Sequence, residues 1–379
     1  MNRPLPLSEA VAAVADHLRP TAAHHDATAE FPFANFARLH EAGLLGLTVP
    51  RRFGGRGGRL VEATTVIGAI AAAEPSTALV LAMQYIHHAT MHGRGWPADL
   101  AERLGREAVA DGALINSLRV EPDLGTPARG GLPATTARRV PGGFRLAGHK
   151  IYATGIPILT WAVVWARTDD ADPLVGPILV RADAPGIRIA ETWNHLGMRA
   201  TGSHDVVFED VFVPADQAGP LKPPAAWAGP DALHLSWNAL LIGALYDGIA
   251  RAARDWLVGF LQARRPANLG AALATVPRIQ QALGEIDGLL AANARLIRSA
   301  ARDADEGQAP TANESALLKS TVTGNAIAAV EAAIRLAGNP GLSRDNALER
   351  HYRDVLCARI HTPQDDMAWA AAGRAALGL

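Results

Sequence analysis

The first part of the chain carries the hydrophobic spacing of helices. Apolar residues recur at helical intervals within Phe36–Leu44 and within Val66–Ile70, and a longer apolar stretch runs from Ser76 to His92. Such spacing places the apolar side chains on one face of each helix, where they can pack against neighbouring helices. We therefore expect residues 1–112 to form an N-terminal helical domain.

The pattern changes between Asp111 and Asp216 to short runs that are typical of β-strands. Gly- and Pro-containing turn clusters at Pro141–Gly143 and Asp183–Gly186 separate several of these runs. The runs are Thr135–Val140, Phe144–Ile151, Trp161–Arg167, Ile178–Ala182 and Val206–Val213. We expect residues 113–218 to form a compact domain of mostly antiparallel strands.

A Pro-, Gly- and Ala-rich linker, Gly219–Pro230, leads into a third region, residues 219–379, that reads as a helical bundle. Its clearest helix has apolar residues on steps of three and four, with Asn293 as one polar interruption; the apolar positions are Ile279, Leu283, Ile286, Leu290, Ile297 and Ala300. A further helix begins at the capping-box sequence Thr311–Glu314 and ends at Gly338. The predicted fold class is α+β, with a helical domain, a β-domain and a helical bundle in that order.

Composition and charge exclude several classes of partner. The 379 residues include 36 Lys and Arg against 37 Asp and Glu, a formal net charge of -1. This balance argues against nucleic acid or an anionic membrane as the main partner and favours a small molecule. No signal-peptide core or membrane-length apolar run is present, so a cytoplasmic protein is expected. Cys357 is the single cysteine, which excludes an internal disulfide and favours a packing role.

Two motifs suggest ligand sites but have simpler explanations. The Gly54–Gly58 run lacks the following Lys-Ser/Thr of a phosphate-binding loop, so we expect a turn. His88 and His92 have the spacing of two metal ligands on a helix, but Ala89 stands where a zinc hydrolase has glutamate, and we predict no metal site. The three histidines, His87 included, could face a pocket, although partial surface exposure is the commoner arrangement.

Two other groupings are also expected to be structural. Ser203–Asp205 has the residue types of a catalytic triad, but neighbours on a strand point to opposite faces and no Gly-x-Ser-x-Gly turn surrounds the serine. Asp365 and Asp366 are adjacent, as carboxylates at the first turn of a helix often are, because the helix dipole stabilises them there. Hydrolase chemistry is therefore not expected.

Four segments together resemble the acyl-CoA dehydrogenase superfamily of flavoproteins. They occur in the family's order and span nearly the whole chain. They are Leu39–Pro50 with Gly54–Gly55, Gly148–Gly155, Leu196–Pro214, and Leu348–Arg350 with Arg353–Asp354. The resemblance implies the acyl-CoA dehydrogenase fold, a flavin cofactor, either FAD or FMN, and a homotetramer built by the C-terminal bundles.

The resemblance also assigns the flavin ring to particular residues. The residues that match Tyr152 and Thr154 in the Lys-x-aromatic-x-Thr strand pack on the isoalloxazine, with Thr154 near N5. The segment Val120–Pro122, with Thr126, lies on the other side of the ring in the family. Packing within the β-domain is the alternative role for these positions.

Near the C-terminal bundle the resemblance points to cofactor contacts across a subunit interface. Arg264, at the end of the first long helix of the bundle, and Gln280 are similar to residues that hold the phosphate or adenosine part of the cofactor, and Arg265 could take the same role. The family's Gln-x-x-Gly-Gly segment is replaced by Arg335–Asn339, which leaves the usual FAD pose open.

Departures from the family pattern affect the chemistry. A dehydrogenase of this family uses a glutamate base, and its two known positions correspond to Thr362 and about Asn238 in this sequence. Neither residue can act as a carboxylate base. Next to the first position stands His361, in a region similar to the reduced-flavin monooxygenases of the superfamily, where a pocket histidine stabilises or protonates a flavin peroxide.

We therefore expect a flavin-dependent oxidoreductase, with monooxygenation of a small organic substrate as the preferred activity. Reduced flavin would then come from a partner reductase. His361 is the expected acid-base group because the pKa of imidazole lies near neutral pH; a C-terminal helix-end histidine is the alternative. Acyl-CoA or acyl-carrier dehydrogenation stays open with Asp365 or Asp366 as base, as does a non-catalytic protein that binds flavin or an acyl thioester.

Overall fold

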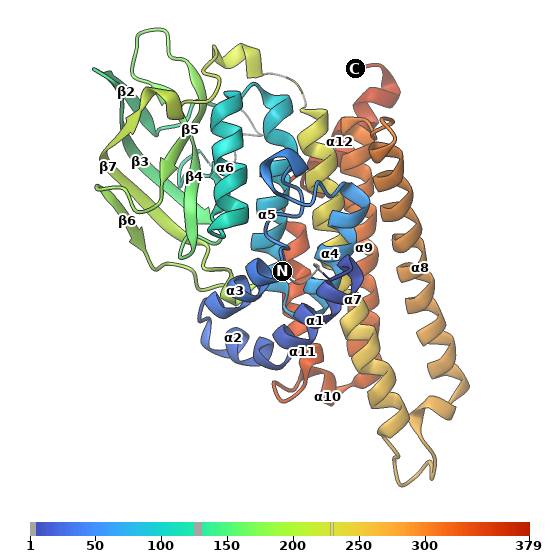
Figure 1. Cartoon of the computed structure of the whole chain (residues 1–379). Helices are drawn as coiled ribbons and strands as arrows, with labels where there is room; N and C mark the ends of the chain where they lie inside the picture. Colours follow the sequence, from blue (N-terminus) through green and yellow to red (C-terminus); the bar gives the residue numbers. More distant parts are fainter. Residues whose placement is uncertain (1–4, 125–130, 228, 230) are drawn as a thin grey trace.

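The computed structural model describes residues 5–124, 131–227, 229 and 231–379. Helices precede and follow the strands along the chain. In space both groups of helices lie on the same side of the sheet (Figure 1). The N-terminal helices are α1 (Leu7–Leu18), α2 (Ala22–Thr28), α3 (Phe33–Glu41), α4 (Leu60–Ala73), α5 (Pro75–Thr90) and α6 (Ala98–Ala110). The expected helical N-terminal region is thus confirmed, and its last helix ends just before the first strand.

Helix α5 lies between the sheet and the long C-terminal helices (Figure 1). It begins sharply because Pro75 occupies its first turn and the Glu74 carboxylate accepts hydrogen bonds from the backbone N–H of Ser76 and Thr77. Nearly all of its side chains are buried, including His87 and His88. The expectation of exposed histidines is wrong for these two, because α5 is covered on several faces, whereas His92 after the helix is exposed.

The β-domain is one curled sheet of seven strands in the order β1-β4-β2-β3-β7-β6, with β5 paired to β4. The strands are β1 (Leu114–Leu118), β2 (Thr136–Val140), β3 (Gly143–Ala153), β4 (Leu159–Thr168), β5 (Val175–Arg181), β6 (Ile187–Ala190) and β7 (His204–Pro214). Only β1 and β2 pair in parallel with β4, so the mostly antiparallel sheet is confirmed. β1 and β6 are additional to the predicted strands; they are short and carry no strong alternation of their own.

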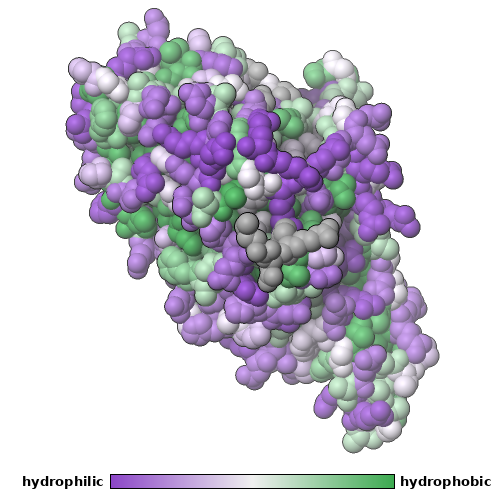
Figure 2. Space-filling view, in the orientation of Figure 1, coloured by the Kyte–Doolittle hydropathy of each residue, from purple (hydrophilic) through white to green (hydrophobic). Residues whose placement is uncertain are grey.

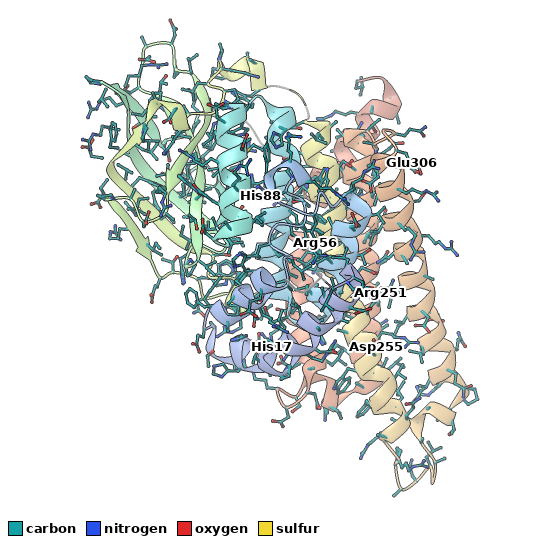
Figure 3. All side chains as sticks on the ribbon, viewed as in Figure 1. His17, Arg56, His88, Arg251, Asp255 and Glu306 are labelled. Carbon is teal, nitrogen blue, oxygen red and sulfur yellow. The ribbon has the colours of Figure 1, made fainter. Side chains whose placement is uncertain are left out.

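The C-terminal region is the predicted helical bundle. Its helices are α7 (Ala232–Ala263), α8 (Pro277–Asp305), α9 (Ala312–Ala337), α10 (Asn339–Leu342), α11 (Ala347–Leu356) and α12 (Asp365–Leu377). Asn293 of α8 is fully buried and donates to the backbone carbonyl of Val322 at 3.0 Å while its side-chain oxygen accepts from Asn325. Arg251, labelled in Figure 3, joins α7 to the Leu290 carbonyl of α8 at 2.7 Å. These polar contacts fix how the helices are aligned along the bundle.

The loop between β6 and β7 ties the β-domain to the bundle. The Met198 N–H donates to the Asp354 carboxylate of α11 at 2.7 Å, and Arg353 forms an ion pair with Asp26 of α2 at 2.6 Å. A Cβ on Gly197 would lie 2.4 Å from the Arg353 carbonyl oxygen, so this close approach requires glycine. Burial raises the pKa of Asp354 to about 7.

Hydrophilic and hydrophobic side chains are mixed on the surface. Hydrophilic side chains cover most of the visible face, and hydrophobic patches between them are small (Figure 2). Among the helices of the described residues, none has both the length and the apolar character needed to cross a membrane. Gly54–Gly58 forms the expected turn: a Cβ on Gly55 would lie 2.2 Å from the Val49 carbonyl oxygen, so this turn packs on its own chain.

Candidate functional site

Three hydroxyl groups meet where strand β3 ends. The Thr154 Oγ1 atom lies 3.0 Å from Ser203 Oγ, which lies 2.8 Å from Thr201 Oγ1. The Asn116 side chain donates to the Thr154 carbonyl oxygen at 2.9 Å and so holds the end of β3 against β1. We call Thr154, Ser203 and Thr201 the hydroxyl row. Thr201 and Ser203 are buried and Thr154 is partly exposed, so Thr154 is the member of the row that a ligand could reach.

Tyr152 presents an aromatic face next to the hydroxyl row. Its side chain is 52% exposed, and its backbone has a φ of 57°, which is uncommon for a residue other than glycine. The ring makes edge contacts with Trp193 and with His195, and these two rings stack on each other at 3.7 Å. Exposed aromatic rings beside hydroxyl groups suit a planar ligand that also needs hydrogen bonds.

A buried ion pair between Lys150 and Glu121 lies in the β-domain near Tyr152 and Thr154. Lys150 Nζ lies 2.6 Å from Glu121 Oε1 and donates to the Trp165 carbonyl oxygen at 2.6 Å. Burial, partly offset by Glu121, lowers the pKa of Lys150 to about 8. Burial would raise the pKa of Glu121, but hydrogen bonds from Lys150 and Thr135 outweigh it and hold that pKa below its usual value. The pair fixes the segment after β1 against β3.

The two positions where the family places its glutamate base meet in space. The Asn238 side chain on α7 donates to the Thr362 carbonyl oxygen at 2.7 Å across 124 residues of sequence. The Asn238 side chain thus lies against the backbone of Thr362, and neither residue carries a carboxylate. An amide and a hydroxyl in this place can orient a ligand but are poor proton acceptors.

His361 borders the same region. Its ring lies 5.8 Å from the Tyr246 ring of α7, and the side chain is partly buried. Burial and the nearby Lys319 ammonium lower the pKa of His361 to about 4. The expectation of a pKa near neutral pH is therefore wrong: at pH 7 the imidazole is neutral, with one N–H donor and one acceptor nitrogen.

The two candidate carboxylates of the alternative chemistry lie in the first turn of α12. Asp365 Oδ1 is 3.5 Å from Nζ of the buried Lys319, whose ammonium also donates to the Ala358 carbonyl oxygen. Asp366 is exposed. Both sit at the helix N-terminus as predicted, where the backbone N–H groups favour negative charge.

The remaining predicted residues are more scattered. Val120 accepts a hydrogen bond from the Ile151 N–H at 3.0 Å and so lies beside β3, whereas Thr126 falls outside the described residues. Arg264 follows α7 and Gln280 is in the first turn of α8, both exposed at the end of this helix pair that points away from the sheet (Figure 1). Within one chain they do not approach Thr154.

The apparent triad is dispersed, as expected. Ser203 belongs to the hydroxyl row, the Asp205 carboxylate contacts His149 at 2.9 Å, and His204 accepts a hydrogen bond from the Trp193 N–H. Cys357 is partly buried, and burial raises its thiol pKa to about 12, which makes it a poor nucleophile.

Sequence reasoning missed several residues of this site, namely Asn116, Trp193, Tyr246 and Lys319. The one available signal was polar residues inside otherwise apolar runs, which Asn116 and Lys319 both are. Nothing in the local sequence distinguishes Trp193 or Tyr246 from core aromatics.

Three family models match consecutive parts of the chain. They describe the acyl-CoA dehydrogenase N-terminal domain over residues 7–94, the middle domain over residues 120–211 and the C-terminal domain over residues 240–365. The matches follow the same order as the helical region, the sheet and the bundle.

Individual proteins match over nearly the full length. YdbM of Bacillus subtilis (strain 168), whose name assigns it to the acyl-CoA dehydrogenases, is 33% identical over 94% of this chain and 93% of its own. L-evernosamine nitrososynthase of Micromonospora sp. is 32% identical over 93% of this chain and 85% of its own. The structure of KijD3 with FMN and a dTDP-linked amino keto sugar superposes with a TM-score of 0.86 at 30% identity, over 99% of this chain and 95% of that one.

Proposed function

The chain belongs to the acyl-CoA dehydrogenase family of flavin-dependent oxidoreductases, and from this premise we propose that it is a monooxygenase that uses reduced flavin and dioxygen on a small organic substrate. The observation that carries the proposal is the contact between Asn238 and Thr362, because both positions for a glutamate base are brought together without a carboxylate. Two relatives support it: one is named a nitrososynthase, and KijD3 binds FMN in its complex.

The residues of the site fit a flavin. Tyr152 and the rings beside it offer an exposed aromatic face, and Thr154 places a hydroxyl at the edge of that face. Bound reduced flavin would supply the electrons that activate dioxygen. Thr154 would hydrogen-bond the ring, and Val120, with Thr126, would border it as the family resemblance implies.

His361 would act on the oxygen side of the reaction as a neutral hydrogen-bonding group. With its pKa at about 4, the imidazole keeps one N–H to donate and one nitrogen to accept at neutral pH. The fully buried Tyr246 ring lies beside it and would help to keep water from the reacting atoms.

The deciding experiment determines which flavin the purified protein carries and whether that flavin reacts with dioxygen or with an acyl-CoA. We expect a colourless protein that binds dithionite-reduced FMN more tightly than oxidised FMN and consumes dioxygen when the two are mixed. A dehydrogenase would instead be purified yellow with tight FAD, and an acyl-CoA such as butyryl-CoA would bleach that colour without oxygen. Anaerobic bleaching of this kind would contradict the proposal.

The similarity to YdbM favours acyl-CoA dehydrogenation as a second candidate. This chemistry needs a carboxylate base, for which Asp365 and Asp366 stand nearest in sequence to the vacated position. In that case Asp365→Asn or Asp366→Asn should abolish flavin reduction by the thioester, and His361→Asn should only perturb it. Asp365 lies 3.5 Å from the Lys319 ammonium.

Replacing Thr154 with valine should weaken flavin binding by roughly tenfold, since the loss of one hydrogen bond costs about 1 kcal/mol. Valine keeps the shape of threonine and leaves the strand intact. Thr136→Val on β2 provides the control, because Thr136 lies in the same sheet away from the hydroxyl row. Equilibrium dialysis with reduced FMN measures both variants, and unchanged affinity in Thr154→Val would assign Thr154 to packing alone.

We also propose that Arg264 and Gln280 contact the cofactor of a neighbouring subunit in a homotetramer. Both are exposed at the end of α7 and α8 that points away from the sheet. Dilution to monomers should then release flavin. A monomer with full flavin affinity would show that neither residue contacts the cofactor.

A further inference from the structure

A small cavity lies next to the candidate site, between β1, β4 and the helices α5 and α7. Its volume is about 50 Å³. The residues that matter for its chemistry are Ser117 and Arg119 on and after β1, Trp165 on β4, Trp227 in the linker, His87 on α5 and His234 on α7. Arg119 directly precedes Val120, and His234 lies one helical turn before Asn238. The cavity is therefore lined by neighbours in sequence of the proposed flavin and base positions.

The cavity carries a net positive charge. The Arg119 guanidinium stacks over the Trp165 ring at 4.7 Å and forms no ion pair or hydrogen bond among the described residues, although the Asp231 carboxylate lies near enough to attract it. Arg94, which also lines the cavity, is paired with Asp231 at 2.6 Å. Burial and Arg94 lower the pKa of Arg119 to about 10, so it stays protonated at neutral pH.

Two imidazoles complete the polar wall. His87 is only 7% exposed and lines the cavity. His234 has a buried Nδ1 atom that lacks a partner in the same residues. Burial holds the pKa of both well below the usual value, so each imidazole is neutral and has an N–H to donate. Buried polar groups without partners are costly unless a ligand satisfies them.

We propose that this cavity binds a carboxylate of the substrate, with Arg119 as the charge partner and His87 and His234 as additional donors. The planar guanidinium matches the two oxygens of a carboxylate. A volume of about 50 Å³ suits a group of a few atoms, since a cavity holds one water once about 10–15 Å³ is open to it. A purely apolar acyl chain would leave the charge and both imidazoles unsatisfied. The inference rests on the proposed function only in placing the rest of the substrate beside the flavin.

The test measures binding of propionate and of its neutral isostere, propionamide, to the FMN-saturated protein by ligand-observed NMR titration at fixed ionic strength. We expect propionate to bind at least tenfold more tightly than propionamide. Arg119→Gln should reduce that ratio to less than threefold, whereas Arg119→Lys, which keeps the charge, should retain part of it. Arg139→Gln is the matched control: Arg139 also stacks on an aromatic ring, Phe144 at 5.5 Å, but on the exposed surface of β2.

Three results would overturn the assignment. They are equal affinities of the wild type for the two probes, a preference that survives in Arg119→Gln, and tighter binding of inorganic phosphate than of propionate. Circular dichroism of each variant confirms that it is folded, and Arg119→Lys remains informative if Arg119→Gln is not. FMN binding is recorded in the same samples, so failure of the flavin proposal is seen separately from failure of the carboxylate site.

Discussion

Replacing His361 with asparagine is expected to shorten the delay between oxygen consumption and hydrogen peroxide release by roughly 10- to 100-fold, since leaving a buried polar group without its hydrogen bond costs about 1–3 kcal/mol. Asparagine keeps a donor and an acceptor but cannot place either of them where the imidazole Nε2 atom lies. Flavin binding should be unchanged, because the hydroxyl row and Tyr152 are untouched. Stopped-flow oxygen consumption and a peroxide assay, both with reduced FMN, measure the delay without any substrate.

His92→Asn is the matched control for this variant. His92 also lies next to an aromatic ring, Phe53 at 5.6 Å, but its side chain is exposed. Since burial holds the pKa of His361 at about 4, its imidazole gains a proton only as the pH falls toward that value. His361 should therefore cause no change in the wild-type delay between pH 6 and pH 8. A normal delay in His361→Asn would remove His361 from the chemistry.

Lys150→Met should lower the free energy of unfolding by about 3–5 kcal/mol, because it leaves the Glu121 carboxylate buried without its counter-charge. The ammonium is fully buried and the carboxylate is 2% exposed, so water compensates neither group. Urea denaturation measures the change. The same substitution should weaken flavin binding, since the pair holds the segment after β1 in place.

The double variant Lys150→Met, Glu121→Gln separates loss of the pair from loss of packing. It removes the unpaired charge, so it should recover part of the lost stability. Arg181→Met serves as the control, because the Arg181–Asp183 pair is exposed and its loss should cost less than about 1 kcal/mol. Equal losses in Lys150→Met and Arg181→Met would show that burial of the Lys150–Glu121 pair has no special role.

Features set by neighbours in sequence could be predicted, and features set by distant partners could not. The α8 pattern and the Thr311 cap each lie within one helix, and both predictions are confirmed. The burial of His87, the lowered pKa of His361 and the contact of Asn238 with Thr362 depend on packing between separate elements. Family resemblance added Thr154 and the two base positions as predictions, which the pattern of neighbouring residues alone does not supply.

The hydroxyl row also bears on which oxidation state of a flavin the site would favour. The Thr201 hydroxyl donates to the Met198 carbonyl oxygen at 3.0 Å, so Ser203 donates to Thr201 and Thr154 donates to Ser203. This order leaves the Thr154 oxygen as an acceptor toward a ligand. Atom N5 of a flavin accepts a hydrogen bond when oxidised and carries a hydrogen when reduced, so a ring beside Thr154 would meet a group of matching polarity in its reduced form.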